Sequence, residues 1–491
     1  MRHSPEVLDY EGVFSSKRSR PGESESLDKA VFKEREIEQP SREADESVTK
    51  PIDEPPSFME VEAGKWQARK GHGLTFVCLF VFSIVLYFRP YELVPALSSF
   101  KTMAFYVGIV TLAVYVVSQI MLEGNLTSRP REVNMVLLIG VAALLSIPFA
   151  IDRTEAWGAF SDLLIKTILI FLVLVNVVRT ELRLKLLLWL ILVVSIYLCL
   201  NLISDYQSGV FKIGEAETNT QRVAGAIKGL FENSNDLALH LVTIIPISIA
   251  LALEKKSHLR KIIYFGIALL MVAAVIITFS RGGFLGLIAM TLVLARKLGR
   301  RNKTTALAAL VLAIIFFVGI APGAYAGRLA TIFDSASDIT GSSSQRTEVL
   351  KRSIWVALRY PIFGVGLENF HHKSEQELGT HNAYTQVAAE MGIAAMVCYI
   401  IFLVHPIRKL RMIERELFER NERSRFYYLA IGLQASLVGY MVASFFAAVA
   451  YQWYVYYLVA YAIALRRIYY LEEAQKAQAP NKDPQTTNIP N

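Results

Sequence analysis

Residues 262–295 read IIYFGIALLMVAAVIITFSRGGFLGLIAMTLVLA, two apolar runs joined by Ser280-Arg281-Gly282-Gly283. The runs cover 262–279 and 283–295, and Arg281 is the one charged residue in the whole stretch. An α-helix needs about 20 apolar residues to cross the hydrocarbon of a bilayer, so the first run is long enough and the second is short. The stretch predicts two membrane helices that meet at a membrane surface.

The same apolar pattern recurs along the whole chain. It is found at 74–88, 102–122, 133–149, 160–178, 186–203, 237–253, 262–279, 283–295, 304–323, 382–404, 427–447 and 452–471. The first and eighth runs are short, and the fourth carries Asp162 and Lys166 near one end, so these three are the least well defined. The sequence predicts an all-α polytopic membrane protein with about twelve transmembrane helices.

Composition supports this class. Hydrophobic residues make up 53% of the 491 residues, and the mean hydropathy is +0.38. The net charge of +8 comes from Lys and Arg in short segments beside the apolar runs, which argues against nucleic-acid binding. The three cysteines lie far apart inside apolar stretches, so neither a disulfide framework nor a cysteine metal site is expected.

Both ends of the chain are polar. Residues 1–71 carry 16 acidic and 12 basic residues and no apolar core, so they predict a disordered cytoplasmic tail and not a secretory signal. We expect a membrane domain at 72–471 and a second disordered cytoplasmic tail at 472–491.

Basic residues predict the orientation of the spans. With the N-terminus inside, the inner connections hold 21 basic residues, whereas the short outer connections hold Arg89, Lys101, Arg153 and Arg281. Because Lys and Arg are enriched in cytoplasmic loops, both termini are predicted to be cytoplasmic. Two longer outer segments remain, 204–236 and a large loop at about 324–381 between spans nine and ten. Functional surface is expected there.

Arg281 and His381 are candidate functional residues at the outer surface. Arginine binds phosphate oxygens in a bidentate manner, and the glycines after Arg281 would let backbone N–H groups approach an anion. His381 lies directly before a predicted helix that Asn382 or Thr380 would cap, and a histidine suits proton transfer near neutral pH. Each residue alone also fits an ordinary interfacial side chain.

Arg346 and Arg222 are the other candidates, one in each long outer segment, and each alone also fits a solvated loop charge. Together, three arginines and one histidine on the outer side favour a ligand that carries phosphate, such as a lipid-linked pyrophosphate. No metal site is expected, because the adjacent His371 and His372 would point apart on a regular element.

These motifs resemble the O-antigen ligase and O-antigen polymerase superfamily of bacterial membrane glycosyltransferases. The resemblance covers about residues 222–400 and rests on three stretches. They are Ser280-Arg281-Gly282-Gly283-Phe284-Leu285-Gly286, Pro361 to Phe370, and His381-Asn382-Ala383-Tyr384 with Glu390-Met391-Gly392-Ile393.

The resemblance implies a multi-pass enzyme of the bacterial inner (plasma) membrane that needs no metal and no cofactor. Its implied donor is a glycan on undecaprenyl pyrophosphate, and its implied acceptor is a hydroxyl of lipid A core or of another glycan, on the periplasmic face. By position, His381 matches the histidine that activates the acceptor, and Arg281, Arg346 and Arg222 match arginines that hold the pyrophosphate.

Three alternatives remain open at this point. A polysaccharide polymerase would use the same donor with a second lipid-linked repeat unit as acceptor. A secondary transporter or flippase for lipid-linked glycans would carry ionisable residues near the middle of its spans. A membrane scaffold would recruit partners through the polar tail at 1–71.

Overall fold

The computed structural model describes residues 71–93, 102–209, 212–213, 221–222, 231, 233–300, 303–304, 342–374 and 378–478. All of them belong to one compact unit, Pro56–Asn491. The predicted tail at 1–71 lies outside the described residues except for Gly71, and the predicted span at 304–323 lies outside them except for Thr304. For a few residues, Arg222 among them, only the backbone is described.

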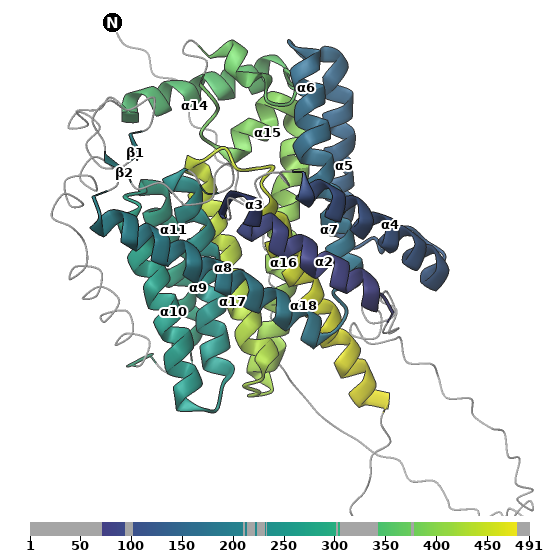
Figure 1. Cartoon of the computed structure of the whole chain (residues 1–491), viewed down its shortest axis with the longest axis vertical. Coiled ribbons are helices and arrows are strands. Elements are labelled where there is room, and N and C mark those ends of the chain that lie inside the picture. The colour runs from purple at the N-terminus through teal and green to yellow at the C-terminus, as the bar shows by residue number, and fades with distance from the viewer. Residues whose placement is uncertain are drawn as a thin grey trace, which may run out of the picture. The chain divides into compact units, whose positions relative to one another are not determined.

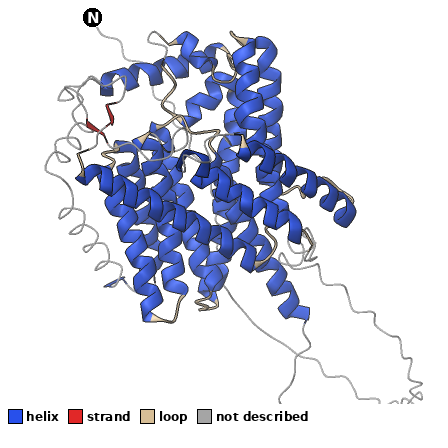
Figure 2. Ribbon diagram, viewed as in Figure 1, coloured by secondary structure: helices blue, strands red, loops and turns tan. Residues whose placement is uncertain are grey.

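The described part of the chain is almost entirely helical (Figures 1 and 2). The α-helices are α2 (Gly73–Phe88), α3 (Pro90–Leu93), α4 (Met103–Glu123), α5 (Arg131–Ser146), α6 (Arg153–Ala159), α7 (Ile165–Val177), α8 (Glu181–Gln207), α9 (Ser234–Glu254), α10 (His258–Ile277), α11 (Arg281–Gly299), α14 (Ser342–Arg359), α15 (Ala383–Met391), α16 (Ile393–Glu419), α17 (Arg425–Ala443) and α18 (Trp453–Gln478). Short 3-10 turns are η2 (Ile147–Phe149), η5 (Asn369–Lys373) and η6 (Ser444–Phe446), and η3 (Phe160–Leu164) is a π turn. Two short antiparallel strands, β1 (Lys212–Ile213) and β2 (Gln221–Arg222), pair with each other.

Within the described residues, nine helical segments are long and apolar enough to cross a membrane. They are Met103–Glu123, Arg131–Phe149, Arg153–Val177, Glu181–Gln207, Ser234–Glu254, His258–Ile277, Arg281–Gly299, Ile393–Glu419 and Arg425–Phe446. The predicted helical, multi-pass class is therefore confirmed, while the count of twelve stays a prediction. The predicted first span is α2, a shorter apolar helix of 16 residues, and α18 continues past residue 471 to Gln478.

α9 packs against α17, with α10 and α11 beside them (Figure 1). Small residues allow this close packing. A Cβ atom at Gly283 would lie 2.6 Å from the Cβ of Ala238, and one at Gly286 would lie 2.9 Å from the Cβ of Ala443. Helices in a bilayer associate largely through such close contact, so the glycines hold the start of α11 against its neighbours.

One predicted span, 382–404, is divided by the structure into α15 and α16 at Gly392. Gly392 has a φ of +92°, and the next N–H, that of Ile393, donates to the carbonyl of Pro361 at 2.8 Å. The loop after Pro361 continues along α15, where the N–H groups of Val365 and Gly366 donate to the carbonyls of Ala389 and Glu390 (2.9 and 3.0 Å). These bonds fasten the outer segment to the membrane domain.

Two buried carboxylates of the helical bundle form ion pairs. Glu132 accepts two hydrogen bonds from Arg466 (2.8 and 3.2 Å) and contacts His405 at 2.9 Å. Arg179 pairs with Glu123 where α4 and α7 end. A buried charge without a partner is costly, so these contacts satisfy charges that the apolar interior would otherwise disfavour.

Replacing Gly392 by alanine tests the joint between α15 and α16. The new Cβ atom would lie 2.2 Å from the carbonyl oxygen of Ile362, and its φ lies in a region that favours glycine. We expect Gly392→Ala to lower stability by about 1–3 kcal/mol, measured by thermal unfolding in detergent. Gly158→Ala is the matched control, because a Cβ atom there meets nothing within 4 Å. Equal stability of the two variants would show that the joint is not constrained as described.

Candidate functional site

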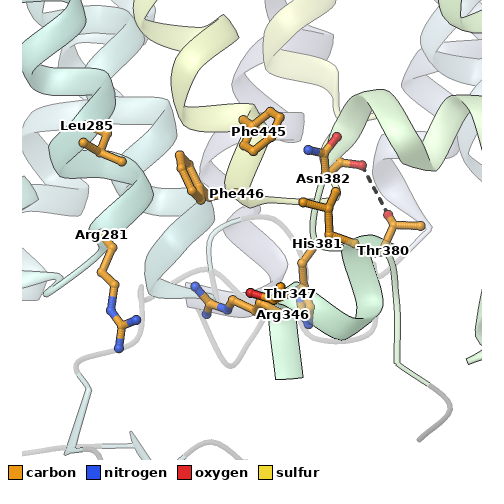
Figure 3. Close-up of a pocket in the computed structure, with 10 residues that line it drawn as sticks. Arg281, Leu285, Arg346, Thr347, Thr380, His381, Asn382, Phe445 and Phe446 are labelled. Carbon is orange, nitrogen blue, oxygen red and sulfur yellow. Dashed lines mark hydrogen bonds between the residues drawn. The ribbon is translucent and has the colours of Figure 1, made fainter. Parts of the chain in front are cut away.

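Three of the four predicted site residues line one pocket. Arg281, Arg346 and His381 surround a cavity of about 330 Å³ (Figure 3). Its other lining residues are the polar Thr347, Thr380 and Asn382 and the apolar Leu285, Leu350, Phe445 and Phe446. For Arg222 the structure gives only the backbone, in β2, so its contribution to the pocket stays a prediction.

Arg281 is held at the first position of α11 by a local hydrogen-bond network. Ser280 is the N-cap residue, and its Oγ accepts from the N–H of Gly283 at 3.1 Å. The same hydroxyl donates to Oδ1 of Asn235, in the first turn of α9, at 2.9 Å. The backbone from which the Arg281 side chain extends is therefore fixed by two helices.

The glycines after Arg281 have a different role from the predicted one. Gly282 and Gly283 are buried inside the first turn of α11, where a Cβ atom at Gly282 would lie 2.9 Å from the Cβ of Phe446. The N–H of Gly283 is already used by the Ser280 cap. The expected exposure of these N–H groups to an anion is thus wrong for Gly283, and both glycines serve helix packing.

His381 lies directly before α15 and is exposed. Asn382 is the N-cap, as one of the two predicted alternatives has it, and its Oδ1 accepts from the N–H groups of Tyr384 and Thr385 at 2.9 and 3.0 Å. Thr380 donates through Oγ1 to the carbonyl of Asn382 at 3.3 Å. His381 itself has a φ of +49°, which turns the chain sharply into the helix.

Arg346 comes from α14, which packs on α15 through a small apolar cluster of its own. Val349 and Val356 of α14 lie against Val365 and Phe370 of the following loop and Ala389 of α15. Arg352, one and a half turns beyond Arg346, donates through Nε to the carbonyl of Lys373 at 2.8 Å. The position of Arg346 therefore depends on the fold of the outer segment and not on a membrane helix.

The pocket has a charged side and an apolar side. Its titratable lining residues, within the described chain, are Arg281, Arg346 and His381, all basic side chains. Figure 3 draws the two guanidinium groups on one side and the rings of Phe445 and Phe446 on the other. Arg281 and His381 also stand at the N-terminal ends of α11 and α15, where helix dipoles favour negative charge. The arrangement suits an anion joined to an apolar group.

Sequence reasoning did not predict two contributions to this pocket. Phe445 and Phe446 reach it from η6, which contacts α15 because Oγ of Ser444 donates to the hydroxyl of Tyr384 at 3.4 Å. Asn382 was considered only as a cap, yet its Nδ2 is buried and has no hydrogen-bond partner within the described structure. That amide could donate to a ligand in the pocket.

The expectation that His371 and His372 point apart is wrong. They lie in η5, a single 3-10 turn and not a long regular element, and their ring centroids are 4.0 Å apart. Nε2 of each imidazole lies near the carboxylate of Glu155 in α6, at 3.7 Å for His371 and 3.0 Å for His372. None of these three residues lines the pocket.

Comparison with known proteins identifies the segment that contains the pocket residues. Residues 266–400 match a family model described as O-antigen ligase. This segment of the chain matches the O-antigen ligase family. The resemblance predicted from the motifs is thereby confirmed, and this segment includes Arg281, Arg346 and His381 but not Arg222. Neither the curated proteins nor the solved structures gave a match.

The Ser280 cap can be tested within the O-antigen ligase domain. Ser280→Ala removes the acceptor for the N–H of Gly283 and the donor to Asn235, and loss of an N-cap side chain costs about 1 kcal/mol. We expect a lower thermal unfolding temperature than for Ser257→Ala. Ser257 is the N-cap of α10 but makes no side-chain capping bond, so it is the matched control. Equal unfolding temperatures would contradict the proposed bracing of Arg281.

Proposed function

We propose that this protein transfers a glycan from undecaprenyl pyrophosphate to an acceptor hydroxyl on the periplasmic face of the bacterial inner membrane, with both termini in the cytoplasm. The observation that carries the proposal is the meeting of Arg281, Arg346 and His381 in one pocket, although they come from three separate helices or helix ends. The O-antigen ligase domain supports the same general chemistry.

Arg281 and Arg346 would bind the donor pyrophosphate, with Arg222 as a third contact. As the bond from sugar to pyrophosphate breaks, negative charge grows on the leaving oxygen, and fixed guanidinium groups stabilise that charge. Arginine suits this role because its planar group binds two phosphate oxygens at once. With this positive charge in place, we propose that the transfer is independent of a metal ion at the pocket.

His381 would act as the general base. Its imidazole accepts the proton of the acceptor hydroxyl while that oxygen attacks the anomeric carbon from the side opposite the pyrophosphate. The new glycosidic bond forms as the old bond breaks, so the anomeric configuration inverts. Asn382 would donate from its buried Nδ2 to a hydroxyl of the glycan.

The apolar side of the pocket fits the rest of the donor. A lipid-linked pyrophosphate is an anion attached to a long isoprenoid chain, and Phe445 and Phe446 lie opposite the arginines in the pocket (Figure 3). We propose that the first isoprene units contact these rings. The polarity of the pocket then matches the polarity of the donor.

The placement of buried charges favours an enzyme over a transporter. Glu132 is the second residue of α5, and Glu123 is the last residue of α4. A transporter would be expected to carry such ionisable residues near the middle of interrupted helices. The ion pairs of Glu132 and Glu123 instead lie near helix ends, and neither residue lines the pocket.

Transfer by the reconstituted protein tests this proposal. Full-length protein in liposomes would receive an undecaprenyl-pyrophosphate-linked glycan with lipid A core as acceptor, or with excess donor alone. We expect Arg281→Ala, Arg346→Ala and His381→Ala each to reduce the rate by roughly 100-fold or more, as loss of a charge-stabilising group or general base does. Measurement of product by gel shift or mass spectrometry gives the rate.

Two matched variants control for general damage. Arg359→Ala removes an exposed arginine from the last turn of the same helix as Arg346, and His258→Ala removes an exposed histidine at the start of α10. Both should transfer at the wild-type rate. Transfer to core lipid would identify a ligase, and growth of the donor glycan would identify a polymerase. A His381→Ala protein as fast as wild type would refute the proposed base.

A further inference from the structure

A second cluster of ligand-type side chains lies outside the pocket. Glu155 of α6 and His371 and His372 of η5 each offer one nitrogen or oxygen atom, and these atoms all lie within 4.8 Å of one another. The two elements are separated by more than 200 residues in the chain. Convergence of two imidazoles on one carboxylate from such distant segments requires an explanation.

The distances fit a shared metal ion. Nε2 of His371 lies 3.7 Å from Oε1 of Glu155, and Nε2 of His372 lies 3.0 Å from Oε2. With zinc bonds of about 2.0–2.1 Å to nitrogen and oxygen, two ligand atoms of a tetrahedral site lie about 3.3 Å apart. The two observed separations lie on either side of that value, although each nitrogen faces a different oxygen of the Glu155 carboxylate, so both imidazoles are placed to bind an ion held by that carboxylate.

The tautomer of His371 is already the one that a metal ligand needs. Its Nδ1 lies 2.8 Å from the carbonyl oxygen of Glu368. A carbonyl can only accept, so Nδ1 carries the proton, and the neutral ring has its lone pair on Nε2, the atom that faces Glu155. Metal-binding histidines commonly have such a backbone partner on the other nitrogen, because it orients the ring.

Both sides of the cluster are held in place by hydrogen bonds that do not involve the three ligands' side chains. The N–H of Asp152 donates to Oδ1 of Asn369 in η5 at 2.6 Å, and the N–H of Ile151 donates to the carbonyl of Val365 at 3.1 Å. These contacts align α6 with η5. A site preorganised in this way loses little entropy when an ion binds.

Negative charge beside the cluster favours a cation. Asp152 caps α6, where its Oδ1 accepts from the N–H groups of Thr154 and Glu155 at 2.8 and 3.1 Å. Together with Glu155, it places two carboxylates next to two imidazoles.

We propose that Glu155, His371 and His372 bind one divalent transition-metal ion of the zinc class. Two imidazoles and one carboxylate are a donor set that zinc accepts, with water in the fourth position. The three side chains are 28–38% exposed, which leaves a path for the ion and room for that water. The ion would link α6 to the segment that also carries Arg346.

Metal titration of the full-length protein tests the site. The protein would be purified through a tag that contains no histidine, treated with EDTA, and titrated with ZnCl₂ by calorimetry and with CoCl₂ by visible absorption. We expect one ion per chain and, for Co²⁺, the spectrum of a nitrogen- and oxygen-ligated site. We also expect Zn²⁺ to raise the thermal unfolding temperature of the wild type.

Variants assign the ion to these residues. Loss of a supporting hydrogen bond costs a metal site roughly 10–100-fold in affinity, so His371→Ala, His372→Ala and Glu155→Gln, which remove ligands, should each weaken Zn²⁺ binding by at least about 100-fold. His258→Ala, which removes an exposed histidine elsewhere, should bind as the wild type does. Without metal, all of these variants should unfold near the wild-type temperature, because the ligands are partly exposed.

Either of two results would overturn the proposal. Equal Zn²⁺ affinity of His371→Ala/His372→Ala and the wild type would assign the ion to another site. Absence of binding to the wild type would leave the contact between His372 and Glu155 as an ordinary ion pair. The metal titration does not test the glycan-transfer proposal, because none of the three ligands lines the pocket.

Discussion

The joint at Gly392 is the constraint on which the arrangement of the site depends. The outer segment carries Arg346, and the helix that follows His381 ends at this joint. Backbone hydrogen bonds from Val365, Gly366 and Ile393 couple the two, and a Cβ atom at Gly392 would lie 2.2 Å from the carbonyl oxygen of Ile362 in the same contact. The loop after Pro361 is thereby held against α15 and α16, and a site built from distant segments requires such support.

Charge is distributed in the helical domain according to the cost of burying it. Glu132, Glu123 and their basic partners form compact pairs inside the bundle, so their charges are neutralised locally. The pocket instead gathers basic side chains at helix N-termini, where the dipoles have the same sign. Such a concentration of positive potential disfavours the empty site and favours an anionic occupant, so the electrostatics of the pocket and its proposed ligand are complementary.

The sequence predicts well those features that depend on neighbours along the chain. Apolar run length was sufficient to find helices such as α4 and α8, and cap chemistry limited the N-cap of α15 to Asn382 or Thr380, of which the structure has Asn382. The interruption at Gly392 was not predicted, because its cause is the carbonyl of Pro361, about 30 residues earlier in the chain. His371 and His372 were misjudged for the same reason, since their common direction is set by Glu155 of α6.

Arg281, Arg346 and His381 could be grouped in advance by their predicted side of the membrane. That criterion could not add Phe445 and Phe446 to the pocket, because the sequence placed both residues in an ordinary predicted span.

The backbone of His381 bears on how this protein balances activity against stability. Its φ of +49° lies in the left-handed region, which costs a residue with a Cβ atom about 1–2 kcal/mol relative to glycine. Histidine adopts this conformation more readily than most residues, but glycine would adopt it with less strain. Glycine at this position would therefore give a more stable fold, and the imidazole of His381 is present at the cost of backbone strain.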